Sequence, residues 1–158
     1  MDSGPDMITA ILGILKTGNA YVPLVADFPV KRINFIIYHA EIDIFIIDSK
    51  NKSRLSNTSI NKEIHWIMLE DINTQQPDRL TFTREVCTDT DAYLLYTSGS
   101  TGIPKGVSQT HRSVLYFIHR YTENLEITPG DNLTLLSSLT HDVSFPNASA
   151  LSFSRGSI

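Results

Sequence analysis

Cysteine is almost absent from this chain, which carries a single one, Cys87, among 158 residues. One thiol cannot form an intramolecular disulfide, and no group of cysteines and histidines has the spacing of zinc ligands. This excludes a small scaffold held together by disulfides, and we expect no metal site. We expect the protein in a reducing compartment, the cytoplasm.

The chain also lacks long apolar runs and a strong charge of one sign. The apolar run at residues 8–15 is too short to cross a bilayer, and Asp2 and Asp6 stand where a signal peptide would be positive. With 19% charged residues and a formal net charge of −4, the chain offers no electrostatic reason to bind nucleic acid or an anionic membrane. We expect neither partner, and small molecules are the better candidates.

Alternating helix and strand patterns are present instead. Apolar residues recur at helical spacing in three segments, at residues 5–16, at residues 27–39 and after a capping Thr110. The last helix is predicted to have an apolar face formed by Val114, Phe117, Ile118 and Tyr121. Short apolar runs predict strands at residues 21–24, 42–47, 64–69, 92–96 and 133–136. The polar segment 48–61 is predicted to be a loop or a weak helix, and segment 70–90 a polar connection. This order implies an α/β fold, a layered sheet with flanking helices.

The strand pattern at residues 92–96 runs straight into T-S-G-S-T-G-I-P-K-G at residues 97–106. Its glycines permit backbone angles closed to other residues, its hydroxyls are donors, and its lysine is a flexible positive charge. Such a loop can turn consecutive N–H groups toward one anion, so it suits phosphate. The candidate phosphate-binding residues are Thr97, Ser98, Gly99, Ser100, Thr101, Gly102, Lys105 and Gly106.

The spacing within this loop excludes two common nucleotide motifs. A Walker A loop needs its lysine directly after the second glycine, but Ile103 and Pro104 separate Gly102 from Lys105. The glycines also fail the G-x-G-x-x-G spacing of dinucleotide-binding folds. From composition alone, a flexible Ser/Gly loop between two strands is the alternative.

The ordered string T-S-G-S-T-G-x-P-K-G resembles the phosphate-binding signature of the AMP-forming adenylate synthetases. Residues 15–24 are similar to the L-K-x-G-x-A-Y-V-P-L motif of the nonribosomal peptide synthetase branch, and residues 28–32 resemble its Y-P-x-x-R. The resemblance covers roughly residues 7–145 and implies a partial N-terminal subdomain of an adenylate-forming enzyme. We therefore expect a partial adenylation domain at residues 1–145 and a divergent, disordered tail at residues 146–158.

The resemblance also implies an activity and its site. The family joins a carboxylate to the α-phosphate of ATP, with Mg²⁺, and expels pyrophosphate; the phosphopantetheine thiol of a carrier protein then takes the acyl group. Lys105 would assist catalysis as the phosphate-loop lysine. Asp142, in a string similar to the family's F-D-x-S core, would pair with the α-amino group of an amino acid. His141 stands where the family commonly has phenylalanine, and a turn or capping role for Asp142 is the alternative. Implied partners are the amino acid, ATP, and carrier-protein and condensation modules.

The match to the family stops after Ser144. The family's adenine pocket, ribose-binding aspartate, magnesium-holding glutamate and C-terminal lysine lie in later motifs. We therefore expect a fragment, left by a frameshift or premature end, with little activity alone. Two alternatives are a nucleotide- or pyrophosphate-binding module without turnover and a piece that completes an active site with a separate chain. A partial sheet is also expected to expose apolar faces and an open edge.

Overall fold

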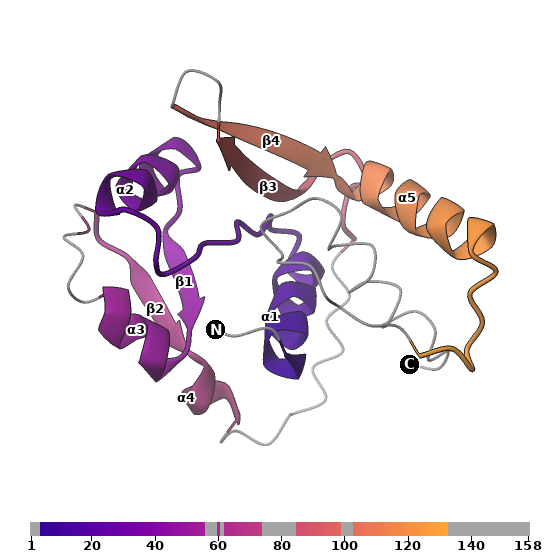
Figure 1. Ribbon diagram of the computed structural model, residues 1–158, viewed down its shortest axis with the longest axis horizontal. Coiled ribbons are helices and arrows are strands. Elements are labelled where there is room, and N and C mark those ends of the chain that lie inside the picture. Colours follow the sequence, from indigo (N-terminus) through magenta and orange to yellow (C-terminus); the bar gives the residue numbers. More distant parts are fainter. Residues whose placement is uncertain (1–3, 56–59, 61, 74–84, 99–102, 133–158) are drawn as a thin grey trace.

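The structure is a computed structural model that describes residues 4–55, 60, 62–73, 85–98 and 103–132. Helices and strands are interspersed along this part of the chain (Figure 1). In chain order the elements are α1 (Pro5–Lys16), α2 (Val30–His39), β1 (Ile44–Ile47), α3 (Ser49–Leu55), β2 (His65–Met68), α4 (Leu69–Asn73), β3 (Asp91–Ser98), β4 (Pro104–Thr110) and α5 (His111–Asn124). The predicted strand at 133–136 and the predicted tail at 146–158 lie outside the described residues.

The first helix, α1, follows the predicted pattern. Pro5 occupies its first turn, where a missing N–H removes no helical hydrogen bond, and Lys16 lies in its last turn. Gly18 ends it with φ of 74° and donates its N–H to the carbonyl oxygen of Leu15 at 3.0 Å. A left-handed residue just past a helix end is most easily a glycine, and Gly18 meets that need at the end of α1.

One group of elements consists of α2, β1, α3 and β2. Strands β1 and β2 are parallel, with Phe45 opposite Trp66. The aromatic rings of these two residues lie 5.0 Å apart between centroids. Helix α2 buries Ile33 and Ile37 in a common core with residues of β1 and α3. Trp66 packs against this core.

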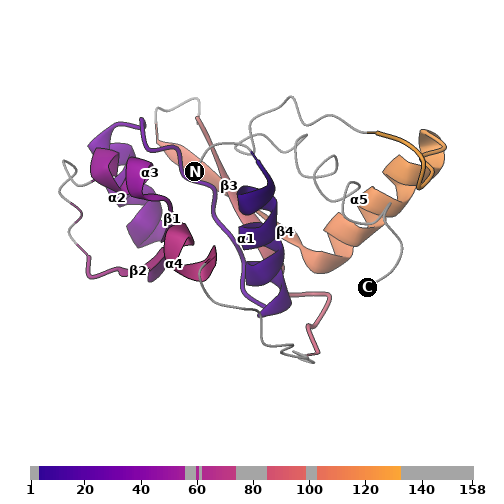
Figure 2. The same ribbon diagram turned by 90° about the horizontal axis from the view of Figure 1, so that it is seen from below.

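A second group consists of α1, the β3–β4 hairpin and α5. Strands β3 and β4 are antiparallel, and Tyr21 forms a single parallel bridge with Tyr93 of β3. Helix α1 lies alongside the hairpin, and α5 continues from the end of β4 (Figure 2). Their common core is formed by Ile11, Tyr21, Ala92, Tyr93, Leu95, Val114 and Ile118. The two groups lie next to each other, and α2 of the first group lies beside the loop end of the hairpin in the second (Figure 1).

The structure differs from the predicted elements in several places. The strand expected at residues 21–24 is only the Tyr21 bridge, whereas β4 was not predicted at all. Segment 48–61, predicted to be a loop or a weak helix, contains the helix α3, whereas the connection predicted at residues 70–90 begins within α4. The helix expected at residues 27–39 starts at Val30, after Pro29. Phe117, expected in the buried face of α5, is 50% exposed and stacks on Tyr121 with ring centroids 6.1 Å apart.

Large apolar side chains remain exposed in the second group. They include Val107 on β4 and Leu115, Tyr116 and Phe117 on α5. In the described residues β4 pairs only with β3, so its outer edge has no strand partner there. The expected exposed apolar faces and open edge are therefore present. Within the part of the chain that the structure describes, no helix combines the length and apolar character needed to span a bilayer.

Candidate functional site

Two of the predicted phosphate-binding residues face each other across the hairpin. Thr97, near the end of β3, is the cross-strand partner of Lys105 in β4, and both side chains are exposed. Directly opposed residues of an antiparallel pair present their side chains on the same face of the sheet. A hydroxyl and an ammonium group are thereby brought together, although the loop between β3 and β4 separates Thr97 from Lys105 in the sequence.

The structure describes only part of the predicted site. Ser98 is paired with Pro104 at the end of the hairpin. Gly99, Ser100, Thr101, Gly102 and Asp142 lie outside the described residues, and so does the tail. Their assignment to phosphate or to the amino acid therefore stays a prediction.

Gly106 does not have the unusual backbone angle that was expected of the loop glycines. It is an extended residue of β4, and its φ is not in the positive range that favours glycine. It is paired with Tyr96, whose ring lies across it: a Cβ built on Gly106 would be 3.2 Å from Cζ of Tyr96. Gly106 thus makes room for an aromatic ring instead of supplying an unusual backbone angle.

Tyr96 is held from the other side by α2. Its hydroxyl is hydrogen-bonded to Nδ1 of His39 at 2.7 Å. The rings of Phe35 and His39 lie edge-on to the Tyr96 ring, with centroids 6.4 and 5.6 Å away. Tyr96 is only 7% exposed, and this burial raises the pKa of its phenol above the ordinary value of 10.0. The side chain next to Thr97 is therefore fixed by packing on both sides.

Arg32 provides a second link between α2 and this strand. Its Nη2 donates a hydrogen bond to the backbone carbonyl oxygen of Tyr96 at 3.1 Å. The guanidinium also lies over the ring of Phe28, with Cζ 4.3 Å from the centroid, an arrangement that holds a cation against an aromatic face. Arg32 belongs to the segment that resembles Y-P-x-x-R, for which the sequence predicted no role.

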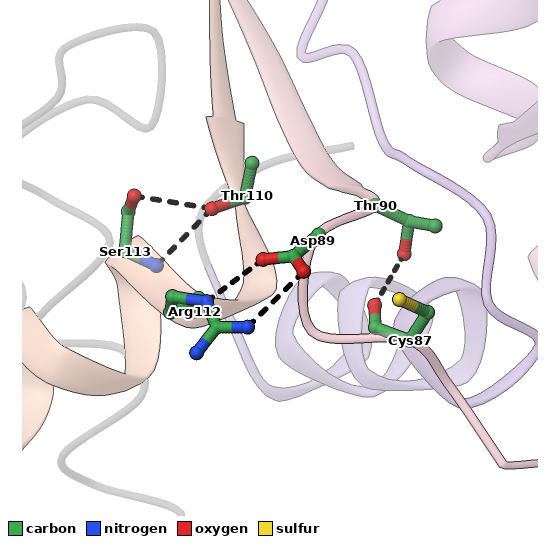
Figure 3. Close-up of polar contacts among 6 residues, drawn as sticks. All are labelled: Cys87, Asp89, Thr90, Thr110, Arg112 and Ser113. Carbon is green, nitrogen blue, oxygen red and sulfur yellow. Dashed lines mark hydrogen bonds and ion pairs between the residues drawn. The ribbon is translucent and has the colours of Figure 1, made fainter.

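The opposite end of the hairpin is anchored to the start of α5 (Figure 3). Arg112 donates two hydrogen bonds to the carboxylate of Asp89, at 2.7 and 3.1 Å. The hydrogen bond and charge of Arg112 hold the pKa of Asp89 below its usual value, and Asp89 raises the pKa of Arg112. Thr110 caps α5 by accepting a hydrogen bond from the N–H of Ser113 at 3.2 Å, as predicted.

Tyr96 and His39 were missed as site residues, but the sequence contained one signal for them. Arg32, Phe35 and His39 are spaced by three and by four residues, which places them on one face of a helix. A face with a cation, an aromatic ring and an imidazole is not a simple core face. What the spacing could not give is the partner, because Tyr96 is 64 residues from Arg32 and 57 from His39.

The donor set at the hairpin end suits an anion better than a cation. Exposed hydroxyl and ammonium groups are hydrogen-bond donors for phosphate oxygens, and no carboxylate faces them in the cross-strand pairs. Among the residues that the structure describes, no three His, Cys, Asp or Glu side chains are close enough to hold a metal ion. His119, one of two histidines in α5, lies 3.4 Å from a carboxylate oxygen of Glu123. None of the described residues is therefore assigned to the magnesium that the resemblance implies.

Comparison with known proteins identifies the family. A family model described as AMP-binding enzyme matches residues 1–157. Bacitracin synthase 1 of Bacillus licheniformis is 32% identical over 142 residues, which make up 90% of this chain and 3% of the synthase. Among solved structures, the nonribosomal peptide synthetase FmoA3 in its α-methyl-L-serine-AMP bound form has a TM-score of 0.78 and 26% identity. That match covers 94% of this chain and 16% of FmoA3.

A further solved structure supports the fold. ATP-bound MatB from Rhodopseudomonas palustris has a TM-score of 0.82 at 21% identity, with 99% of this chain and 33% of MatB covered. The predicted α/β fold, part of the N-terminal subdomain of an adenylate-forming enzyme, is confirmed. The chain spans 3% of bacitracin synthase 1 and a third or less of the two structures. It belongs to the AMP-binding enzyme family and corresponds to an N-terminal part of the adenylation domain of a nonribosomal peptide synthetase.

Proposed function

We propose that this chain supplies the phosphate-binding part of an amino-acid-activating adenylation site. The parent reaction converts ATP and an amino acid to an aminoacyl adenylate and pyrophosphate. The observation that carries the proposal is the cross-strand pairing of Thr97 with Lys105 at the loop end of the hairpin. The family match and the peptide-synthetase relatives support it.

The chemistry assigns these residues a simple task. A carboxylate oxygen of the amino acid attacks the α-phosphorus, and the bond from this phosphorus to the pyrophosphate oxygen breaks. Negative charge then accumulates on the departing pyrophosphate. The Thr97 hydroxyl can donate a hydrogen bond to that charge and the Lys105 ammonium can neutralise part of it, which lowers the barrier. Lys105 is thus auxiliary to the reaction, since it neither attacks nor leaves.

Other parts of the proposed function rest on the resemblance. Asp142 would pair its carboxylate with the α-ammonium group of the substrate and so select amino acids over plain carboxylic acids. The aminoacyl group would pass from the adenylate to the phosphopantetheine thiol of a carrier protein in a multi-module synthetase. Mg²⁺ would be held by residues of later motifs of the family.

Binding of ATP or pyrophosphate to the purified chain tests the proposal. We expect the melting temperature to rise with millimolar ATP and Mg²⁺, because a ligand that binds only the folded state stabilises it. Lys105→Ala should lower the affinity about tenfold or more, since it removes a charge-assisted contact. Lys31→Ala, which removes an exposed lysine from α2, is the matched control and should bind as the wild type does. The absence of any shift with the wild type would contradict the proposal.

A second experiment separates a catalytic part from a module that only binds nucleotide. The chain is co-expressed with the remaining portion of an adenylation domain, and amino-acid-dependent pyrophosphate exchange is measured. Exchange that disappears with Lys105→Ala is the expected result. Binding of ATP without exchange in this reconstituted pair would favour the non-catalytic binding module instead.

A further inference from the structure

The outer edge of β3, which faces away from β4, is hydrogen-bonded to the backbone of Tyr21. The N–H of Tyr21 donates to the carbonyl oxygen of Ala92 at 3.1 Å, and the N–H of Leu94 donates to the carbonyl oxygen of Tyr21 at 3.0 Å. In a strand, every second residue turns its backbone groups to the same edge. Tyr96 has the same parity as Leu94, so its carbonyl oxygen faces this edge too.

The Tyr21 bridge does not extend to Tyr96. At this position the acceptor is satisfied by a side chain, because Nη2 of Arg32 donates to the carbonyl oxygen of Tyr96 at 3.1 Å. The guanidinium takes the place that a further strand residue would have. Its position is fixed by the Phe28 ring, 4.3 Å from Cζ, and its Nε is buried without a hydrogen-bond partner. A charged group that leaves one buried N–H unsatisfied is costly to keep, so the bond that it does make is expected to matter.

Three contacts hold Tyr96 of β3 in place. Arg32 binds its carbonyl oxygen, His39 binds its hydroxyl at 2.7 Å, and its ring lies against Gly106. Thr97 follows Tyr96 directly, and Lys105 precedes Gly106 in the paired strand. A shift of Tyr96 would therefore move both proposed phosphate-binding side chains.

We propose that Arg32 is a positioning residue for the phosphate-binding end of the β3–β4 hairpin, acting through the carbonyl oxygen of Tyr96. In this role Arg32 acts through another residue and not by direct contact with a substrate. By completing the outer edge of β3 where the strand pairing ends, it sets the place from which Thr97 and Lys105 reach the phosphates. This role rests on the proposed function as far as phosphate binding is concerned, whereas the restraint on the hairpin does not depend on any ligand.

The test combines hydrogen exchange without ligand and binding of ATP with Mg²⁺. Amide exchange is followed by NMR at Thr97 and Lys105, whose backbone groups face each other across the hairpin, with amides of α1 and α5 as internal references. In Arg32→Ala we expect exchange at the hairpin end to rise about tenfold or more and the affinity for ATP to fall by a similar factor. The reference amides should keep their wild-type rates. Lys31→Ala, a change of the neighbouring cation on the same helix, should alter neither quantity.

Arg32→Lys distinguishes positioning from mere bulk. Lysine keeps one cationic donor but loses the planar fork, so exchange and affinity should lie between those of the wild type and Arg32→Ala. If Arg32→Ala does not fold, this variant alone decides: hairpin exchange at the wild-type rate overturns the inference. Unchanged hairpin exchange in Arg32→Ala overturns it as well, and so does exchange that rises equally in α1 and α5. If the wild type binds no ATP, the proposed function fails, and the exchange rates still decide on the role of Arg32.

Discussion

Gly106 and Tyr96 are cross-strand partners in which a missing side chain makes room for a ring. A Cβ on Gly106 would lie 3.2 Å from Cζ and 3.3 Å from Cε1 of Tyr96. The ring is not free to withdraw, because its hydroxyl is hydrogen-bonded to His39 and the Phe35 ring lies perpendicular to it, with centroids 6.4 Å apart. The backbone of the hairpin and the position of α2 are therefore coupled through this residue pair, in addition to the bond from Arg32 to the carbonyl oxygen of Tyr96.

Gly106→Ala is expected to destabilise the fold. The added methyl group overlaps a ring that its neighbours hold, and overpacking of this kind costs about 1–3 kcal/mol. The free energy of unfolding from urea titrations measures the effect. Gly13→Ala is the matched control, because Gly13 lies in α1 with nothing within 4 Å of the added carbon. It should stabilise the helix by about 0.5–1 kcal/mol, so equal effects of the two substitutions would refute the packing argument.

Tyr96→Phe should remove the bond to His39 and leave the ring in place. We expect a loss of about 1 kcal/mol in the free energy of unfolding near neutral pH. Burial raises the pKa of the Tyr96 phenol, so its contribution to stability is full below pH 10.0, the ordinary value, and is lost as the pH rises through the folded-state pKa. The difference between wild type and Tyr96→Phe should therefore shrink above pH 10.0. A difference that stays constant up to the alkaline unfolding of both proteins would show that the hydroxyl contributes nothing specific.

Local patterns in the sequence predicted the elements that face a core. In α1, α2 and α5 the buried residues recur at helical spacing, as Ile33 and Ile37 do. For α3 the sequence predicts either a loop or a weak helix, because its residues are mostly polar. Its start has a local signal all the same, since Asp48 accepts a hydrogen bond from the N–H of Asn51 at 2.7 Å. An aspartate three residues ahead of such an N–H is a helix cap, and it marks the helix that the apolar pattern does not.

Strand β4 and the surroundings of Tyr96 could not be predicted from local patterns. Pro104, Lys105 and Gly106 lack the alternation of a half-buried strand, so β4 forms through its pairing with β3. The phosphate-loop residues could be proposed from the sequence because they are contiguous, and their role stays a prediction. The contacts of Tyr96 with Arg32 and His39 join segments more than fifty residues apart, and they depend on how α2 packs beside the hairpin. Only a three-dimensional structure brings such residues together.

The Asp89–Arg112 pair should give a stability difference that depends on pH. Arg112 lowers the pKa of Asp89, so the contribution of the carboxylate is present above its ordinary value of 3.8 and is lost as the pH falls through the lower folded-state value. Asp89→Asn should lower the melting temperature slightly at neutral pH, because both side chains are about two-thirds exposed. The difference from the wild type should disappear as the pH drops below 3.8. Glu85→Gln, at another exposed carboxylate of the same segment, is the control. A deficit of Asp89→Asn that persists at the lowest pH would exclude the ion pair as its cause.

Thr110→Ala should weaken the start of α5 and with it the junction to β4. The Thr110 hydroxyl accepts the N–H of Ser113 at 3.2 Å, and losing such a cap costs about 1 kcal/mol. Thr110→Ser keeps the oxygen and should retain most of the stability. Urea unfolding monitored by circular dichroism compares the three proteins, and equal midpoints for the alanine and serine variants would show that the cap is not what holds this end. Because Val114 and Ile118 of α5 belong to the same core as α1 and β3, a weakened cap should lower the stability of the whole second group and not of the helix alone.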